Sequence, residues 1–177
     1  GIVYTPVEVV DFIIHSVKHF LKTEFGDTLG SRNVHYLDPF AGTGTFITRL
    51  MQSGLLSVDE LKHKYRHELH ANSSQIHANE LVLLAYYIAA INIESTYHEI
   101  VGGDYAPFEG ICLTDTFQMY ERDDLIDSLL IDNSSRRRRQ KKLDIRVIVG
   151  NPPYSVGQGD ANDNNQNQKY PAVDQRI

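Results

Sequence analysis

Apolar residues follow two patterns along the chain: short β-prone runs, and longer stretches in which they recur every three or four positions. The short runs predict β-strands, and the helical spacing predicts amphipathic helices. Strands are predicted at residues 34–37, 75–78, 110–113 and 145–149. Helices are predicted after Pro6, at residues 45–52 and 58–69, after Glu80, and at residues 120–131. Because strands alternate with helices, we predict an α/β fold with about four parallel strands and helices on both faces, half of a doubly wound sheet.

The first predicted helix carries a capping signal. Thr5 stands at the N-cap position, Pro6 in the first turn and Glu8 three residues after the cap, the arrangement of a reciprocal capping box. The apolar positions that follow at helical spacing are Val10, Ile13, Ile14, Val17 and Leu21. Turn-forming residues at 26–33 predict the end of this helix.

Three later segments differ in their expected burial. Residues 58–69 are polar and charged, so we expect this helix to contribute little to the core. In the next helix, the apolar side chains that share one face are Leu81, Leu84, Ala85, Ile88 and Ile91, and this face is predicted to be buried. Residues 132–142 are polar and basic and are predicted to form a loop. The run Arg136 to Arg139, with Lys141 and Lys142, fits a phosphate-binding segment and a solvated loop equally well.

Composition describes an ordinary globular domain. The chain has 177 residues, of which 41% are hydrophobic and 23% charged. No apolar stretch reaches the roughly 20 residues that span a bilayer, so we expect a cytoplasmic protein with no membrane contact. Cys112 is the one cysteine and lies in an apolar run, which predicts a buried small side chain. The net charge of −6 argues against a nucleic-acid surface spread over the whole domain.

Polar side chains follow each predicted strand. These are Asp38, Glu80, Asp115 and Asn151. Since ligands of open parallel sheets bind at the carboxyl ends of the strands, we expect these side chains to converge on one site.

The turn after the first strand has the composition of a cofactor loop. Gly42 and Gly44 follow Asp38, Pro39 and Phe40 and precede a helix. Glycines let a ligand approach the backbone, and free N–H groups at the helix start suit the carboxylate of a methionine moiety.

Two acidic positions suit the rest of a nucleoside. Glu80 is placed to accept hydrogen bonds from ribose hydroxyls, although a helix-capping role also fits. Asp115 is preferred as the acceptor for the cofactor adenine, with Asp104 as the alternative.

The loop after the last strand reads Asn151, Pro152, Pro153, Tyr154. The amino nitrogen of adenine is a poor nucleophile, because its lone pair is delocalised into the ring, and acceptor oxygens reorient it. Asn151 supplies a side-chain oxygen, and proline supplies a carbonyl without a competing N–H. Tyr154 provides a flat face for an extruded base. The sequence therefore predicts methyl transfer to an adenine amino group.

A metal site is not predicted. Three histidines fall at helical spacing: His63, His67 and His70. Their neighbours Lys62, Lys64 and Arg66 would repel a cation, so a solvated helical face is favoured.

Three segments carry a family resemblance: residues 4–12, 38–46 and 150–154. They resemble the first, cofactor and catalytic motifs of the gamma-class DNA N6-adenine methyltransferases. The residues after Tyr154 further resemble the methylase portion of type ISP restriction-modification enzymes, which fuse nuclease, helicase, methylase and target-recognition domains.

The resemblance implies a Rossmann-like fold and S-adenosylmethionine as cofactor. The residues that it assigns to cofactor binding are Tyr4, Thr5, Pro6, Asp38, Pro39, Phe40, Ala41, Gly42, Gly44, Glu80 and Asp115. It assigns the flipped adenine of duplex DNA to Asn151, Pro152, Pro153 and Tyr154. We expect residues 1–177 to be the N-terminal part of a catalytic domain, lacking later strands and the recognition domain, and inactive in isolation.

Two other functions fit the same motifs. One is methylation of RNA adenine or of a protein glutamine amide, since these residues can bind any planar amide or amino group. The other is a cofactor-binding module that regulates a neighbouring nuclease or helicase without catalysis.

Overall fold

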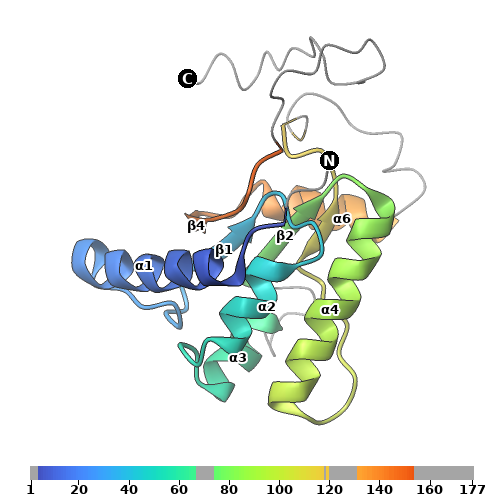
Figure 1. Cartoon of the computed structure of the whole chain (residues 1–177). Coiled ribbons are helices and arrows are strands. Elements are labelled where there is room, and N and C mark those ends of the chain that lie inside the picture. The colour runs from blue at the N-terminus through green and yellow to red at the C-terminus, as the bar shows by residue number, and fades with distance from the viewer. Residues whose placement is uncertain (1–3, 67–73, 118, 120–130, 154–177) are drawn as a thin grey trace.

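A computed structural model describes residues 4–66, 74–117, 119 and 131–153 of the chain. In this part of the molecule, parallel strands form one sheet in the order β3-β2-β1-β4. The strands are β1 (His35–Asp38), β2 (Ile76–Glu80), β3 (Ile111–Leu113) and β4 (Ile145–Ile148), each within two residues of its prediction. The chain order reverses between β1 and β4, so the loops after these two strands lie at the switch point of the sheet (Figure 1).

The helices are α1 (Val7–Phe25), α2 (Thr45–Gln52), α3 (Val58–Tyr65), α4 (Leu83–Val101) and α6 (Ile131–Gln140). α2 packs between α1 and α4, and α6 packs against β3 (Figure 1). Residues 120–130 of the predicted helix 120–131 lie outside the described residues. Among the helices that the structure describes, none has the length and apolarity to cross a bilayer. The predicted α/β fold with a parallel sheet flanked by helices is confirmed.

Strand alternation divides the sheet into two faces. Ile76 and Ala78 belong to the hydrophobic core that includes Ile47 of α2 and Ile93 of α4. His77 alternates with them and lines a cavity shared with residues of α6. α6 therefore covers the side of the sheet opposite to α4.

The capping box predicted for α1 is wrong. The N-cap is Pro6, and no side chain caps the helix. The Thr5 hydroxyl is engaged elsewhere, because it accepts a hydrogen bond from the Asn151 side chain. Proline still suits this helix start, since its missing N–H would have no partner there.

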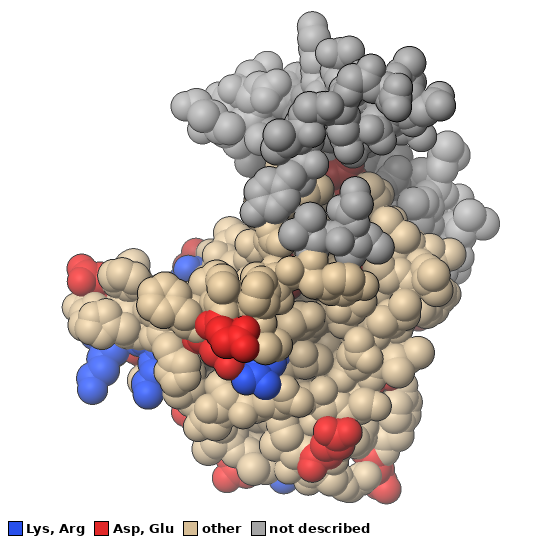
Figure 2. Space-filling view, viewed as in Figure 1, with Lys and Arg blue, Asp and Glu red and all other residues tan. Residues whose placement is uncertain are grey.

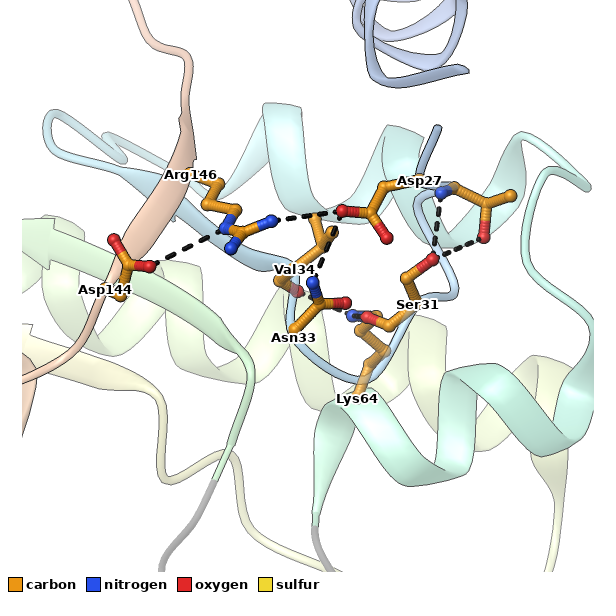
Figure 3. A network of polar contacts seen from close by, with 8 residues as sticks. Asp27, Ser31, Asn33, Val34, Lys64, Asp144 and Arg146 are labelled. Atoms are coloured by element: carbon orange, nitrogen blue, oxygen red, sulfur yellow. Dashed lines mark hydrogen bonds and ion pairs between the residues drawn. The ribbon is translucent and has the colours of Figure 1, made fainter. Parts of the chain in front are cut away.

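The expectation that the helix at 58–69 adds little to the core is also wrong. Leu61, Lys64 and Tyr65 of α3 are at most 2% exposed. The Lys64 ammonium donates to the carbonyl oxygens of Ser31 and Val34, at 2.7 and 2.6 Å, and to Gln75 Oε1 at 3.0 Å. Figure 3 shows the Lys64 side chain next to Ser31 and Val34, which lie between α1 and β1. The same connection contains Asp27, whose carboxylate forms an ion pair with Arg146. The lysine of this charged helix can be buried because neighbouring loops supply acceptor oxygens for its ammonium group.

The face of α4 predicted to be buried is exposed. Leu84 is 69% exposed and Ile91 61%, whereas the buried side chains of this helix are Ala89, Ile93, Thr96 and Tyr97. Figure 2 shows mostly uncharged residues over the upper part of this helix. The helix is apolar around most of its circumference, so spacing alone did not identify the side that faces α2.

The loop predicted at 132–142 is wrong for most of its length, because Ile131–Gln140 form α6. The Asn133 side chain accepts from Leu113 N at 2.7 Å and donates to Leu113 O at 2.9 Å. It thereby pairs the outward-facing main-chain N–H and C=O of Leu113, as a neighbouring strand would. Arg137 is 3% exposed, so the basic run is not a solvated loop.

Candidate active site

Asp38 ends β1 and is fully buried. Its Oδ1 accepts a hydrogen bond from the backbone N–H of Phe40 at 3.0 Å. Its Oδ2 has no hydrogen-bond partner among the described residues. The pKa of Asp38 is raised to about 7, chiefly by burial and in smaller part by the nearby Glu80 charge, while the hydrogen bond from the Phe40 N–H lowers it. A buried carboxyl oxygen without a partner is unusual and marks a place where a ligand can bond.

The Glu80 side chain fixes the turn after Asp38 by hydrogen bonding to its backbone. The Glu80 carboxylate accepts from Gly42 N and from Val82 N, both at 2.8 Å. Gly42 and Gly44 have φ angles of 55° and 86°, which favour glycine, and no atom lies within 4 Å of a side chain built at Gly42. Gly44 is the N-cap of α2, and no acidic residue occupies the first turn of that helix. The turn therefore presents free space and helix N–H groups to a ligand.

The loop after β3 is tied to the same turn. Thr116 Oγ1 donates to Pro39 O at 2.7 Å and accepts from Asn79 Nδ2 at 3.3 Å. The Asp115 carboxylate accepts from Phe117 N at 2.9 Å, and the Phe117 ring lies 5.3 Å from the Phe40 ring. These contacts place Asp115 at the carboxyl edge of the sheet, beside the β1 loop.

The loop after β4 meets the β1 loop directly. A side chain added at Gly150 would lie 2.7 Å from Asp38 Oδ1, so only glycine lets the two segments approach this closely. The next residue, Asn151, donates through Nδ2 to Thr5 Oγ1 at 3.0 Å. This bond joins the β4 loop to the segment before α1, which is 146 residues away in sequence.

The structure brings together most of the predicted site residues. Thr5, Asp38, Gly42, Glu80 and Asn151 are linked by the contacts above. The other predicted residues lie in the same segments: Pro39, Phe40, Ala41, Gly44, Asp115, Pro152 and Pro153.

Some predicted residues are placed differently. Tyr4 is 68% exposed, and Pro6 is exposed at the helix start. Asp104 is exposed between α4 and β3, so it precedes the strand that Asp115 follows and lies at the opposite edge of the sheet. Tyr154 lies outside the described residues, as do His67 and His70.

Two residues of this site were not predicted. Asn79 is 1% exposed, and its Oδ1 has no partner within the described part of the chain. Thr116 is the residue that joins Asn79 to the β1 loop. Asn79 stands between Ala78 and Glu80 in a strand that also contains His77, and Thr116 stands in a turn, so no sequence signal distinguishes either residue.

Comparisons with known proteins identify the family of the chain. A family model described as N-6 DNA Methylase matches residues 1–175. No curated protein matched the chain.

Three solved structures are similar over nearly the whole chain, each with a TM-score of 0.85. The first is a nuclease-deletion mutant of the type ISP restriction-modification enzyme LlaGI with a DNA substrate mimic, 49% identical over 98% of this chain and 14% of that one. The second is the ATP-dependent type ISP enzyme LlaBIII bound to DNA, 49% identical over 99% of this chain and 12% of that one. The third is a DrdV–DNA complex, 42% identical over 100% of this chain and 16% of that one.

The chain thus spans about one seventh of the length of these proteins and matches the methylase portion of the type ISP enzymes. It belongs to the N-6 DNA methylase family.

Proposed function

We propose that this chain transfers the methyl group of S-adenosylmethionine to N6 of adenine in duplex DNA. The observation that carries the proposal is the meeting of two loops at the switch point of the sheet: Gly150 lies against Asp38, and Asn151 follows directly. In open parallel sheets this is the position at which ligands bind.

The residues present fit the proposed cofactor. Asp38 and Glu80 place two carboxyl groups in one site, and neither forms an ion pair within the described part of the chain. A ligand with an ammonium and a sulfonium charge would compensate them, and would keep Asp38 ionised despite its burial. The start of α2 suits the ligand carboxylate, Glu80 the ribose and Asp115 the adenine. When bound, the cofactor supplies an electrophilic methyl group.

Asn151 has the chemistry to orient the substrate. Because its Nδ2 donates to Thr5, its Oδ1 is left to accept a hydrogen bond from an adenine amino group. The Pro152 carbonyl is the second acceptor, and Tyr154 is the proposed stacking face for the flipped base. Two acceptors in fixed positions would direct the nitrogen lone pair toward the methyl group, so transfer proceeds in line. No general base is required, since the methylated ammonium is acidic and releases its proton afterwards.

The DNA substrate and the larger architecture are part of the proposal. The solved relatives LlaGI, LlaBIII and DrdV are complexes with DNA or a DNA mimic. We propose that the full polypeptide is a restriction-modification enzyme, in which a nuclease, a helicase and a target-recognition domain are fused to this domain.

The test is transfer from labelled cofactor to duplex DNA by the full natural polypeptide and its Asn151→Ala variant. We expect labelling to fall about 100-fold, the usual loss when one oriented hydrogen-bonding group is removed from a reacting centre. Cofactor affinity should stay within twofold, because the Asn151 side chain is assigned to the base. The control is Asn33→Ala, because the Asn33 side chain is exposed and donates to the Asp27 carboxylate, away from the candidate active site.

Equal labelling by the wild type and Asn151→Ala would remove the catalytic assignment. Labelling of RNA or protein in place of DNA would favour the alternative substrates. Cofactor binding without transfer to any of them would indicate a regulatory module.

A further inference from the structure

A cavity of about 240 Å³ lies at the end of the sheet opposite to the candidate active site. It is lined where the strands begin, by His35 of β1, by Ser74 before β2 and by Gly110 before β3. The other wall comes from α6 and the segment that follows it. A water molecule occupies roughly 30 Å³ of liquid volume, so this space accommodates a small solute rather than a single water.

One lining side chain is buried without a partner. Gln140 is 4% exposed, and neither its Oε1 nor its Nε2 has a hydrogen-bond partner among the described residues. Leaving a buried amide unbonded is unfavourable, so such groups are normally paired with protein, water or ligand. The Gln140 amide can donate one or two hydrogen bonds to a ligand in the cavity.

The charge of the lining selects an anion. Arg136, Arg139 and Lys142 contribute three cations, against one carboxylate from Glu109. The C-terminal end of α6 adds roughly half a negative charge, which is smaller than the remaining positive excess. Arg136 donates through Nη1 to Tyr86 Oη and Ile111 O, at 3.4 and 3.3 Å, which holds the guanidinium at the cavity wall.

The imidazole pair on the strand side completes the lining. His35 and His77 stack with ring centroids 5.3 Å apart, and His35 Nδ1 lies 3.0 Å from His77 Nε2. Burial, together with His35, Arg139 and Lys64, lowers the pKa of His77 to about 3. A neutral ring keeps one N–H donor, and burial is the largest cause of the lowered pKa.

We propose that this cavity binds a small phosphate dianion, either inorganic phosphate or the phosphate of a mononucleotide. Guanidinium groups bond two phosphate oxygens at once, and the Gln140 amide supplies a neutral donor to a third. The site is separate from the candidate active site, because the strands of the sheet run between them.

The test measures phosphate binding to the full natural polypeptide at constant ionic strength. Phosphorus NMR line broadening and thermal unfolding are recorded with inorganic phosphate, with adenosine monophosphate and with chloride. We expect saturable binding with a Kd below about 1 mM and a rise in melting temperature of about 2–5 °C at saturation. The tighter of the two phosphate ligands identifies the natural class.

The informative variant is Gln140→Glu, which keeps the side-chain shape and adds a negative charge. We expect it to lose phosphate binding at least tenfold while its methyl transfer to DNA stays within twofold. Arg136→Gln is the second variant, in case Gln140→Glu does not fold. The matched control Lys62→Gln removes an exposed cation outside the cavity and should leave binding unchanged.

Three results would overturn the proposal. One is the absence of saturable binding of either phosphate ligand to the wild type. Another is an equal response of wild type and Gln140→Glu. The third is a loss of duplex DNA affinity in Gln140→Glu without any binding of small phosphates, which would assign the cavity to the DNA backbone.

Discussion

At the amino ends of the strands the Lys64 ammonium is buried among three oxygens, whereas at the carboxyl ends the Asp38 carboxyl is buried with Oδ2 unbonded among the described residues. Both side chains are at most 2% exposed. Lys64 has the partners expected of a structural group, and Asp38 lacks one. The difference indicates where the fold is stabilised and where it keeps bonding capacity for a ligand, since functional sites are the places where local rules are broken.

The largest loss of stability is expected from Lys64→Ala. The substitution leaves the Ser31 and Val34 carbonyls and the Gln75 amide oxygen without their shared donor, and opens a space in the core. We expect the free energy of unfolding to fall by about 3 kcal/mol. Denaturant unfolding measures it, with Lys62→Ala on the exposed side of α3 as the control. A loss below about 1 kcal/mol would mean that the three bonds contribute no more than a surface contact.

Asp38→Asn should act in the opposite direction on stability. The folded pKa of Asp38, about 7, lies above the unfolded value of 3.8. The contribution of Asp38 to the free energy of unfolding is therefore fully present below pH 3.8 and is lost as pH rises through 7. Asparagine cannot ionise and retains an oxygen for the Phe40 N–H. We expect the variant to be about 4 kcal/mol more stable than the wild type at pH 8 and nearly equal to it near pH 4.

The cost of this gain should appear in cofactor binding. If Asp38 binds a cationic part of the cofactor, Asp38→Asn should weaken binding at least tenfold, measured by calorimetric titration. If the variant is more stable and its affinity for the cofactor is unchanged, Asp38 is a buried acid that destabilises the fold without binding the cofactor.

His77 provides the contrasting pH dependence at the other end of the sheet. Its folded pKa of about 3 lies below the unfolded value of 6.5, so the unfolded chain takes up a proton first and stability is lost as pH falls below 6.5. Between pH 6.5 and 5 this loss is about 2 kcal/mol. His77→Gln should remove it, as seen in denaturant unfolding at both pH values. The Asp38 and His77 variants should therefore change the slope of stability against pH with opposite sign, and slopes of the same sign would contradict the comparison.

The strands and the convergence of the site could be predicted from the sequence. The apolar runs at β1 and β4 are short and bounded by turn residues, which leaves little choice of element. Once the sheet is parallel, Asp38, Glu80, Asp115 and Asn151 must emerge at one edge. This prediction depends on chain direction alone and needs no knowledge of packing.

What the sequence did not predict depends on partners that are distant along the chain. The buried face of α4 is decided by α2, and the helical form of residues 131–140 is accompanied by Asn133 binding the edge of β3. Lys64 is buried because loops before β1 and β2 offer oxygens to it. A local rule predicted a capping box at Thr5, but the Thr5 hydroxyl accepts a hydrogen bond from Asn151, which is 146 residues away in sequence.

The smallest expected effect, and the most specific, is that of Thr5→Val. Thr5 is either a cofactor contact, as the family resemblance implies, or a positioning residue that holds the Asn151 amide through the 3.0 Å bond. Valine keeps the shape and removes the hydroxyl, and one hydrogen bond of about 1 kcal/mol corresponds to roughly fivefold in rate. For a positioning residue, kcat for DNA methylation falls about fivefold while the cofactor Kd stays within twofold, and Thr5→Ser restores kcat. For a cofactor contact, the Kd rises instead and kcat at saturating cofactor is unchanged. In the Asn151→Ala background the positioning effect should vanish, because the amide that Thr5 holds is no longer present.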